Sequence, residues 1–152
     1  MEDKQLLLSN QICFPLYSAS RLVTKAYKPF LDELGLTYPQ YLVLMVLWEK
    51  DGLSVNQIKE KLHLDTNTLS PLLKRMEKME LLKRNRSITD ERSVIVQLTN
   101  NGRQLKLKAC PIPEKLITQL VSDKIRVEDM LKLKEILDEL MFVLSNKKES
   151  PT

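Results

Sequence analysis

Cysteine has the most nucleophilic side chain in this 152-residue sequence, and it occurs twice, as Cys13 and Cys110. The thiolate is the reactive form of the side chain, and a helix N-terminus or nearby hydrogen-bond donors stabilise it. Tyr17 follows Cys13 by four residues, so on a helix the phenol and the thiol would share one face. Each cysteine therefore has two interpretations, an inert packing thiol of a reduced cytosolic protein or a thiol that responds to oxidants.

A second group of chemically useful side chains lies at residues 65–75. Leucines at helical spacing mark the buried face of this segment, and the polar and basic side chains fall on the rest of its surface. Short hydroxyl and amide side chains at a helix N-terminus can reach base edges or phosphates, and cations further along the helix suit flanking phosphates. An ordinary, well-capped surface helix is the alternative. The candidate DNA-contacting residues are Thr66, Asn67, Thr68, Ser70, Lys74 and Arg75.

Pro71 complicates this helix, because an interior proline costs about 3 kcal/mol. Either the helix contains Pro71, or the regular helix begins there and the polar run extends from its N-terminus.

Three arginines, Arg84, Arg86 and Arg92, follow within an expected β-hairpin. Residues 82–86 and 93–98 have the β-branched and alternating character of short strands, with a polar tip between them. An arginine at such a tip can enter a minor groove, where narrow A·T-rich sequence concentrates negative potential. Asp90 is placed to hold the Arg92 guanidinium by a charge-assisted hydrogen bond. A surface ion pair without function is the alternative.

The basic residues are concentrated in one part of the chain. Residues 59–108 contain twelve basic and six acidic side chains, whereas the whole chain has a net charge of only +4. A cationic segment suits a polyanion, most commonly nucleic acid, although a solvated basic surface would have the same composition.

The elements that would position these side chains are mostly helical. The first expected helix, residues 5–34, is disturbed at Pro15, so the regular helix either starts near Cys13 or bends there. We predict one mainly α domain with a small β-hairpin wing, a winged helix-turn-helix at 38–98 flanked by helices at 1–34 and 100–146. We expect a disordered tail at 147–152. The other predicted helices span 41–48, 55–62, 66–79, 102–109, 114–120 and 127–145.

Composition excludes several classes of protein. With three glycines, a Gly-rich phosphate loop is not expected, and no apolar stretch approaches the roughly 20 residues that span a bilayer. The N-terminus lacks the pattern of a signal peptide, so a soluble cytoplasmic protein is expected. Two distant cysteines and the single histidine, His63, lack the spacing of metal ligands, and we predict neither a metal nor a cofactor.

The segment 64–77, together with Lys83 to Ser87 and Asp90 to Ser93, closely resembles the MarR family of bacterial regulators. The blocks 10–14, 16–17, 27–29 and 36–41 resemble its peroxide-sensing branch, which includes OhrR, MgrA and SarZ. The resemblance covers residues 10–99 and is architectural beyond them. Pro15 departs from the ordinary apolar residue that the branch carries there.

The resemblance implies an intertwined homodimer whose terminal helices interlock and whose two winged domains read a pseudo-palindromic DNA operator. It further implies that organic hydroperoxide or hypochlorite oxidises Cys13, that phenols at Tyr27 and Tyr38 hydrogen-bond its thiolate, and that Tyr17 lies nearby. Oxidation would release the DNA. Two-cysteine members form a disulfide between protomers, so Cys110 is a candidate resolving thiol. Without it, a small-molecule thiol or overoxidation would complete the response.

Four functions are therefore compared. The first is a repressor, not an enzyme, that releases its operator when Cys13 is oxidised. The second is the same DNA-binding regulator released by a small aromatic or phenolic ligand. A thiol peroxidase lacks the catalytic Arg or His partner that it would need. A winged module that binds protein remains open because fold does not determine function.

Overall fold

The computed structural model describes residues 3–146, so the tail predicted at 147–152 lies outside the described residues. The chain forms two compact units, divided between Ile112 and Pro113. The first contains α1 to α5, three strands and the first residue of α6; the second contains the rest of α6 and α7.

The N-terminal helix is shorter than expected. Two 3-10 turns, Lys4–Leu6 and Leu8–Asn10, precede α1, which spans Cys13–Asp32. The helix begins at Cys13, which settles the alternative left open at Pro15. That proline lies in the first helical turn, where a backbone N–H has no intrahelical acceptor and its absence costs little.

Three further helices build the centre of the first unit. α2 spans Tyr38–Glu49 and starts with a capping box, in which the Thr37 N–H donates to Gln40 Oε1 at 2.9 Å. α3 spans Val55–Leu62, as predicted, and α4 spans Thr66–Lys78. Because α4 is regular before Pro71, the alternative in which the helix begins at that proline is wrong.

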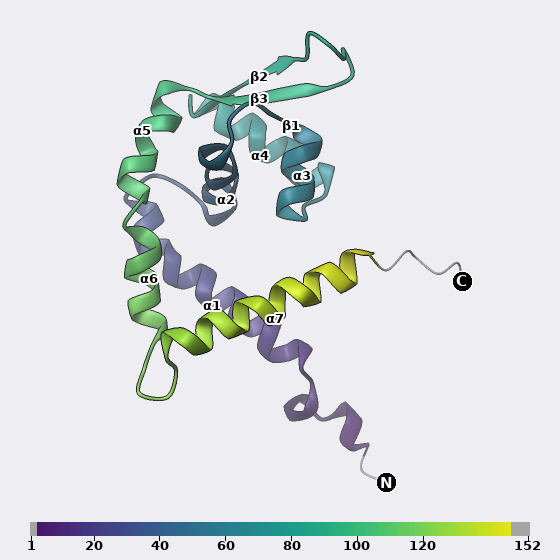
Figure 1. Cartoon of the computed structure of the whole chain (residues 1–152), viewed down its shortest axis with the longest axis vertical. Helices are drawn as coiled ribbons and strands as arrows, with labels where there is room; N and C mark the ends of the chain where they lie inside the picture. The colour runs from purple at the N-terminus through teal and green to yellow at the C-terminus, as the bar shows by residue number, and fades with distance from the viewer. Residues whose placement is uncertain (1–2, 147–152) are drawn as a thin grey trace, which may run out of the picture. The chain divides into compact units, whose positions relative to one another are not determined.

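The wing belongs to a three-stranded sheet. β2 (Leu82–Arg86) pairs with β3 (Val94–Leu98), and the short β1 (Leu53–Ser54) pairs with the other edge of β3. All pairs are antiparallel, and β3 lies in the middle, as Figure 1 shows. The sequence predicted only the two-stranded hairpin, because two residues are too few for a strand pattern.

The hydrophobic core of the first unit determines which face of α4 is exposed. The leucines predicted as the buried stripe, together with Met76, are all buried and belong to one cluster with side chains of α2, α3 and the sheet. The polar face of α4 is thereby directed to solvent. The α4 members of this cluster are Leu69, Leu72, Leu73 and Met76.

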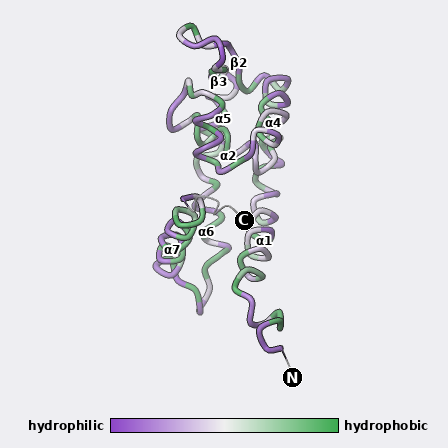
Figure 2. The backbone as a smooth tube through the Cα atoms, turned by 90° about the vertical axis from the view of Figure 1, so that its right-hand side faces the viewer, coloured by the Kyte–Doolittle hydropathy of each residue, from purple (hydrophilic) through white to green (hydrophobic). Residues whose placement is uncertain are grey.

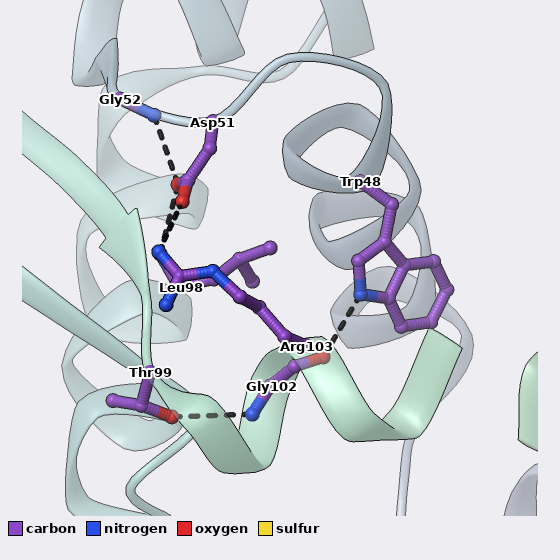
Figure 3. Close-up of polar contacts among 7 residues, drawn as sticks. All are labelled: Trp48, Asp51, Gly52, Leu98, Thr99, Gly102 and Arg103. Carbon is purple, nitrogen blue, oxygen red and sulfur yellow. Dashed lines mark hydrogen bonds and ion pairs between the residues drawn. The ribbon is translucent and has the colours of Figure 1, made fainter. Parts of the chain in front are cut away.

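A polar joint connects α2, β3 and α5 (Figure 3). α5 spans Asn100–Ala109. Asp51 Oδ1 accepts from the backbone N–H groups of Gly52 and Leu98, both at 2.9 Å, and Asp51 Oδ2 accepts from Arg103 at 2.8 Å. The Trp48 indole donates to the carbonyl of Gly102 at 2.9 Å. The wing and α5 are therefore held by the same residues at the end of α2.

α6 spans Ile112–Leu120, and α7 spans Val127–Asn146. Figure 2 shows hydrophobic and hydrophilic stretches alternating along α1 and α7. α7 exposes large apolar side chains, among them Leu131 at 59%, Ile136 at 56% and Phe142 at 63%. Within residues 3–146, no helix is both long and apolar enough to cross a membrane.

Candidate functional site

The outer face of α4 presents the predicted polar residues to solvent. Thr66, Asn67 and Thr68 form the exposed first turn, Ser70 is half-buried, and Lys74 and Arg75 are exposed about two turns further along. In α4 the Asp65 side chain makes no capping hydrogen bond, so the first N–H groups of the helix keep their capacity to donate. This arrangement combines hydrogen-bonding groups at the helix start with positive charge nearer its end.

The tip of the wing is an ordered turn. The Ser87 hydroxyl accepts from the backbone N–H groups of Thr89 and Asp90 at 3.2 and 3.3 Å. Asp90 Oδ1 accepts from the backbone N–H of Arg92 at 3.0 Å. The structure therefore differs from the expectation that Asp90 holds the Arg92 guanidinium, because the tight turn brings the Arg92 backbone to the carboxylate. Arg86 and Arg92 are both exposed.

Arg84 has a different environment from the other two wing arginines. Its Nε and Nη2 donate to Glu77 Oε2 at 3.0 and 2.8 Å, and its backbone N–H donates to Glu77 Oε1 at 2.9 Å. These hydrogen bonds lower the pKa of the Glu77 carboxyl below 4.5. The pair joins the last turns of α4 to β2.

A cleft of about 250 Å³ separates the helices from the wing. Ser70 from α4, Asn56 from the first turn of α3, and Arg84 and Arg92 from the wing all line it. Side chains that lie up to 36 positions apart in sequence are thus brought to one surface. This surface, with the exposed face of α4, is called the reading surface below.

Cys13 is exposed at the first position of α1. Tyr17, one turn later, is 64% exposed, and the Arg21 guanidinium lies 5.5 Å from the centre of its ring. The sulfur of Cys13 is therefore accessible to small molecules in solution.

The other two predicted tyrosines belong to a separate cluster. The ring centres of Tyr27 and Tyr38 lie 4.9 Å apart, and Tyr41 lies 5.8 Å from Tyr27 and 6.4 Å from Tyr38. Burial, followed by the neighbouring phenols, raises the pKa of Tyr27 to about 12. Burial also raises the pKa values of Tyr38 and Tyr41. The phenols therefore keep their protons at neutral pH and remain hydrogen-bond donors.

One chain does not bring Cys13 to the tyrosine cluster. Cys13 and Tyr27 are fourteen residues apart on the same helix, a separation of about 21 Å at 1.5 Å per residue. Cys110, the C-cap of α5, is close enough to the Tyr41 hydroxyl to raise its pKa, after burial and Tyr38. Cys110 is exposed.

A larger cavity of about 520 Å³ lies between α1 and the start of α2. Three cations of α1, Arg21, Lys25 and Lys28, line it together with Tyr38 and Pro39. Asp32 also lines the cavity and pairs with Lys28 at 2.7 Å, so Arg21 and Lys25 supply the net positive charge that, beside apolar walls, suits an aromatic anion. Among residues 3–146, no cluster of side chains has the composition of a metal site.

Sequence reasoning missed three participants. Tyr41, which is buried in the core, was not predicted to belong to a tyrosine cluster, although its spacing of three from Tyr38 places both on one helical face. Glu77 was counted only as an acidic residue, because its partner Arg84 lies on another element. Nothing in the sequence distinguishes Asn56.

Comparisons with known proteins agree with this geometry. A family described as transcriptional regulator SarA/Rot matches residues 25–108. The organic hydroperoxide resistance transcriptional regulator of Bacillus subtilis (strain 168) is 49% identical, over 97% of this chain and 99% of that protein. Reduced AbfR bound to DNA superposes with a TM-score of 0.77 at 36% identity, covering 95% of this chain and 97% of AbfR. The disulfide form of AbfR, a protein of Staphylococcus epidermidis, superposes with a TM-score of 0.62 at 37% identity, covering 93% of this chain and 95% of AbfR.

Proposed function

The chain belongs to the SarA/Rot family of transcriptional regulators, and we propose that it is a DNA-binding repressor that releases its operator when Cys13 is oxidised. The similarity to a regulator of organic hydroperoxide resistance over nearly the whole chain confirms the resemblance to the peroxide-sensing branch. The matched proteins are regulators, in agreement with the prediction that this chain is not an enzyme. Such a protein would act in the bacterial cytoplasm, where the chromosome lies.

The observation that carries the DNA-binding role is the composition of the reading surface. The exposed first turn of α4 offers hydroxyl and amide groups, Lys74 and Arg75 follow on the same helix, and the exposed Arg86 and Arg92 flank the wing tip. The dimensions of an α-helix suit a major groove, and an arginine at a wing tip suits the adjacent minor groove. AbfR, with a similar fold, is bound to DNA in a solved structure.

DNA binding is tested by incubating the reduced protein with a pool of random-sequence duplexes and sequencing the bound fraction. We expect enrichment of a pseudo-palindromic site, to which Arg92→Ala binds with lower affinity and a shallower salt dependence. Replacement of Lys124, outside the reading surface, by alanine is the matched control. Failure to enrich any sequence at low ionic strength would remove the DNA-binding proposal.

The thiol switch is proposed as a two-electron oxidation. The Cys13 thiolate attacks the outer oxygen of an organic hydroperoxide, so that an S–O bond forms as the O–O bond breaks. The inner oxygen leaves as an alkoxide that is protonated to the alcohol, and Cys13 becomes a sulfenic acid. The exposure of Cys13 at a helix N-terminus supports this chemistry. In a gel shift with the enriched duplex, hydroperoxide should release wild-type protein and leave Cys13→Ser bound. Release of that variant by the same oxidant would refute the sensor.

The phenol donors for this thiolate are proposed to come from a second copy of the chain, because Tyr27 is about 21 Å from Cys13 along the same helix. A homodimer formed through residues 1–34 and 100–146 is supported by the large apolar side chains that these segments expose. They include Ile12 and Leu22 in the N-terminal segment and Leu131 and Phe142 on α7. In a dimer with two-fold symmetry, a contact between Cys13 of one chain and the tyrosine cluster of the other would occur twice.

Mixed dimers test this arrangement. One chain carries Cys13→Ser, and the other carries Tyr27→Phe with Tyr38→Phe. If the site forms between chains, the remaining cysteine meets intact tyrosines and reacts with hydroperoxide at the wild-type rate. If the site formed within one chain, that cysteine would have no tyrosine partner, and its reaction would be as slow as in the homodimer of the tyrosine variant.

Cys110 is proposed as the resolving thiol of the partner chain. Its thiol is exposed and contributes to the raised pKa of Tyr41, after burial and Tyr38, and AbfR has been solved in a disulfide form. The Cys110 thiolate would attack the sulfenyl sulfur of Cys13 and release hydroxide, which leaves one disulfide and, overall, one alcohol and one water. A non-reducing gel after hydroperoxide should show a covalent dimer that Cys110→Ser does not form. A covalent dimer formed by that variant would contradict this role.

The cavity between α1 and α2 supports a second candidate trigger, a small aromatic or phenolic ligand. Salicylate, an aromatic anion, is a suitable probe. Release of Cys13→Ser from DNA by salicylate would favour this alternative over the thiol switch, and an unchanged affinity would exclude it for this probe.

A further inference from the structure

We infer that Arg84 does not contact DNA and that, with Glu77, it positions the wing arginines against the reading helix α4. This inference rests on the proposed DNA-binding function and assigns roles within it. It replaces the direct DNA contact that the sequence suggested for Arg84.

The Arg84 guanidinium already uses one edge of its hydrogen-bond donors within the protein. A guanidinium that reads a phosphate must present its planar edge of N–H groups to the ligand. In Arg84 the edge formed by Nε and Nη2 already faces Glu77 Oε2, at 3.0 and 2.8 Å, and the Glu77 carboxylate offsets its charge. The Arg84 side chain is only 29% exposed, whereas Arg86 and Arg92 are both exposed.

Glu77 holds β2 through both the side chain and the backbone of Arg84. Glu77 Oε1 also accepts the backbone N–H of Arg84 at 2.9 Å, so one carboxylate holds both the main chain and the side chain of this residue. Glu77 lies in the penultimate position of α4, and Arg84 lies at the middle of β2, opposite the fully buried Val96. The contact therefore prevents β2 from sliding or tilting relative to α4.

Side chains alternate between the two faces of the sheet along β2. Residues two apart in a strand share a face, so Leu82, Arg84 and Arg86 lie on one side and Lys83 on the other. Leu82 is buried in the core, Arg84 binds Glu77, and Arg86 is exposed. The direction in which Arg86 leaves the sheet is thus determined by the two anchored residues before it, and the turn that carries Arg92 follows directly.

The direction in which Glu77→Ala changes the affinity for DNA distinguishes a positioning role from repulsion between Glu77 and the phosphates. Removing an acidic side chain near DNA normally strengthens binding, because it removes repulsion from the phosphates. If Glu77 positions the wing, Glu77→Ala should instead weaken binding to the enriched duplex, by roughly tenfold, which is the loss expected when one good groove contact is removed. An unchanged or higher affinity of Glu77→Ala would overturn the inference.

Arg84→Lys provides a second, independent variant. Lysine keeps the positive charge that a phosphate contact needs but has no planar fork for the bidentate contact to Glu77. Binding should therefore weaken as much in Arg84→Lys as in Arg84→Ala. Near-wild-type affinity of Arg84→Lys would instead identify Arg84 as a phosphate contact. Lys83→Ala, on the opposite face of the same strand, is the matched control and should bind as the wild type does.

A double-mutant cycle with Arg92→Ala completes the experiment, with affinities measured by fluorescence anisotropy and the active fraction by stoichiometric titration. In a chain that already carries Arg84→Ala, Arg92→Ala should lower the affinity for the duplex less than twofold, because the wing is no longer held in place. Independent losses that multiply would contradict the inference. A lower active fraction with unchanged affinity would show a purely structural role and would also contradict it. Wild-type binding in the same assay tests the proposed function separately.

Discussion

Replacing Asp51 with alanine should destabilise the first unit by disconnecting β3 and α5 from the end of α2. Asp51 accepts three hydrogen bonds, from the backbone of Gly52, the backbone of Leu98 and the Arg103 side chain. These contacts converge at one carboxylate (Figure 3). Their loss should therefore affect the wing and α5 together.

The loss of unfolding free energy expected for Asp51→Ala follows from the environment of each donor that Asp51 accepts from. Arg103 is 56% exposed in its side chain, so its ion pair contributes at most about 1 kcal/mol. The Gly52 N–H can be hydrated after the substitution. The Leu98 N–H is part-buried beside the buried Leu98 side chain, and leaving such a donor without an acceptor costs about 1–3 kcal/mol. We expect a total loss of about 2–3 kcal/mol in the free energy of unfolding.

The assay is urea unfolding at fixed protein concentration, followed by circular dichroism. Asp51→Asn is the control, because its amide oxygen can still accept from Leu98 while the charge is lost, and it should cost about 1 kcal/mol. Asp51→Ala within about 0.5 kcal/mol of the wild type would refute the assigned role of this joint, since that is the range of ordinary surface substitutions.

Three other predictions test local features. Gly102→Ala should cost about 1–3 kcal/mol in urea unfolding, because the new Cβ would lie 2.1 Å from the Leu81 carbonyl oxygen; a neutral effect would contradict the close approach. Because burial raises the pKa of Tyr27 from 10.0 to about 12, the stability that this phenol contributes is complete below pH 10 and declines as the pH rises toward 12. When the pH is raised from below 10 to above 10, the unfolding midpoint should fall less in Tyr27→Phe than in the wild type. Equal falls in the two proteins would contradict the raised pKa of Tyr27. Thr37→Ala should cost about 1 kcal/mol, because the capping box loses the Thr37 side chain that accepts from the Gln40 backbone N–H, and Thr37→Ser should restore it.

Local signals in the sequence were sufficient to predict most of the helices and strands of the winged region. The bounds of α3 are those predicted, since Ser54 caps it and Ile58 gives its buried face. β1 was missed, because its two residues have a strand conformation only through pairing with β3. The continuous helix through Pro71 was left open, because burial of the leucines on both sides of the proline compensates for its local cost.

The candidate site was only partly predictable for a related reason. Exposed residues on one helix, such as those of the first turn of α4, follow from helical periodicity. The pairing of Glu77 with Arg84 and the cleft shared by Ser70 and Arg92 depend on how α4 packs against the wing. The separation of Cys13 from the tyrosine cluster follows only once α1 is known to be continuous from Cys13.

The central claim is that oxidation of Cys13 controls binding to DNA. The most direct measurement is a titration of the reduced protein, bound to its enriched fluorescent duplex, with an organic hydroperoxide, with anisotropy and the mass of the Cys13 peptide followed in the same samples. We predict that release of the duplex rises in proportion to the fraction of oxidised Cys13 and that a dithiol reductant restores binding. DNA that stays bound when Cys13 is fully oxidised would contradict the claim.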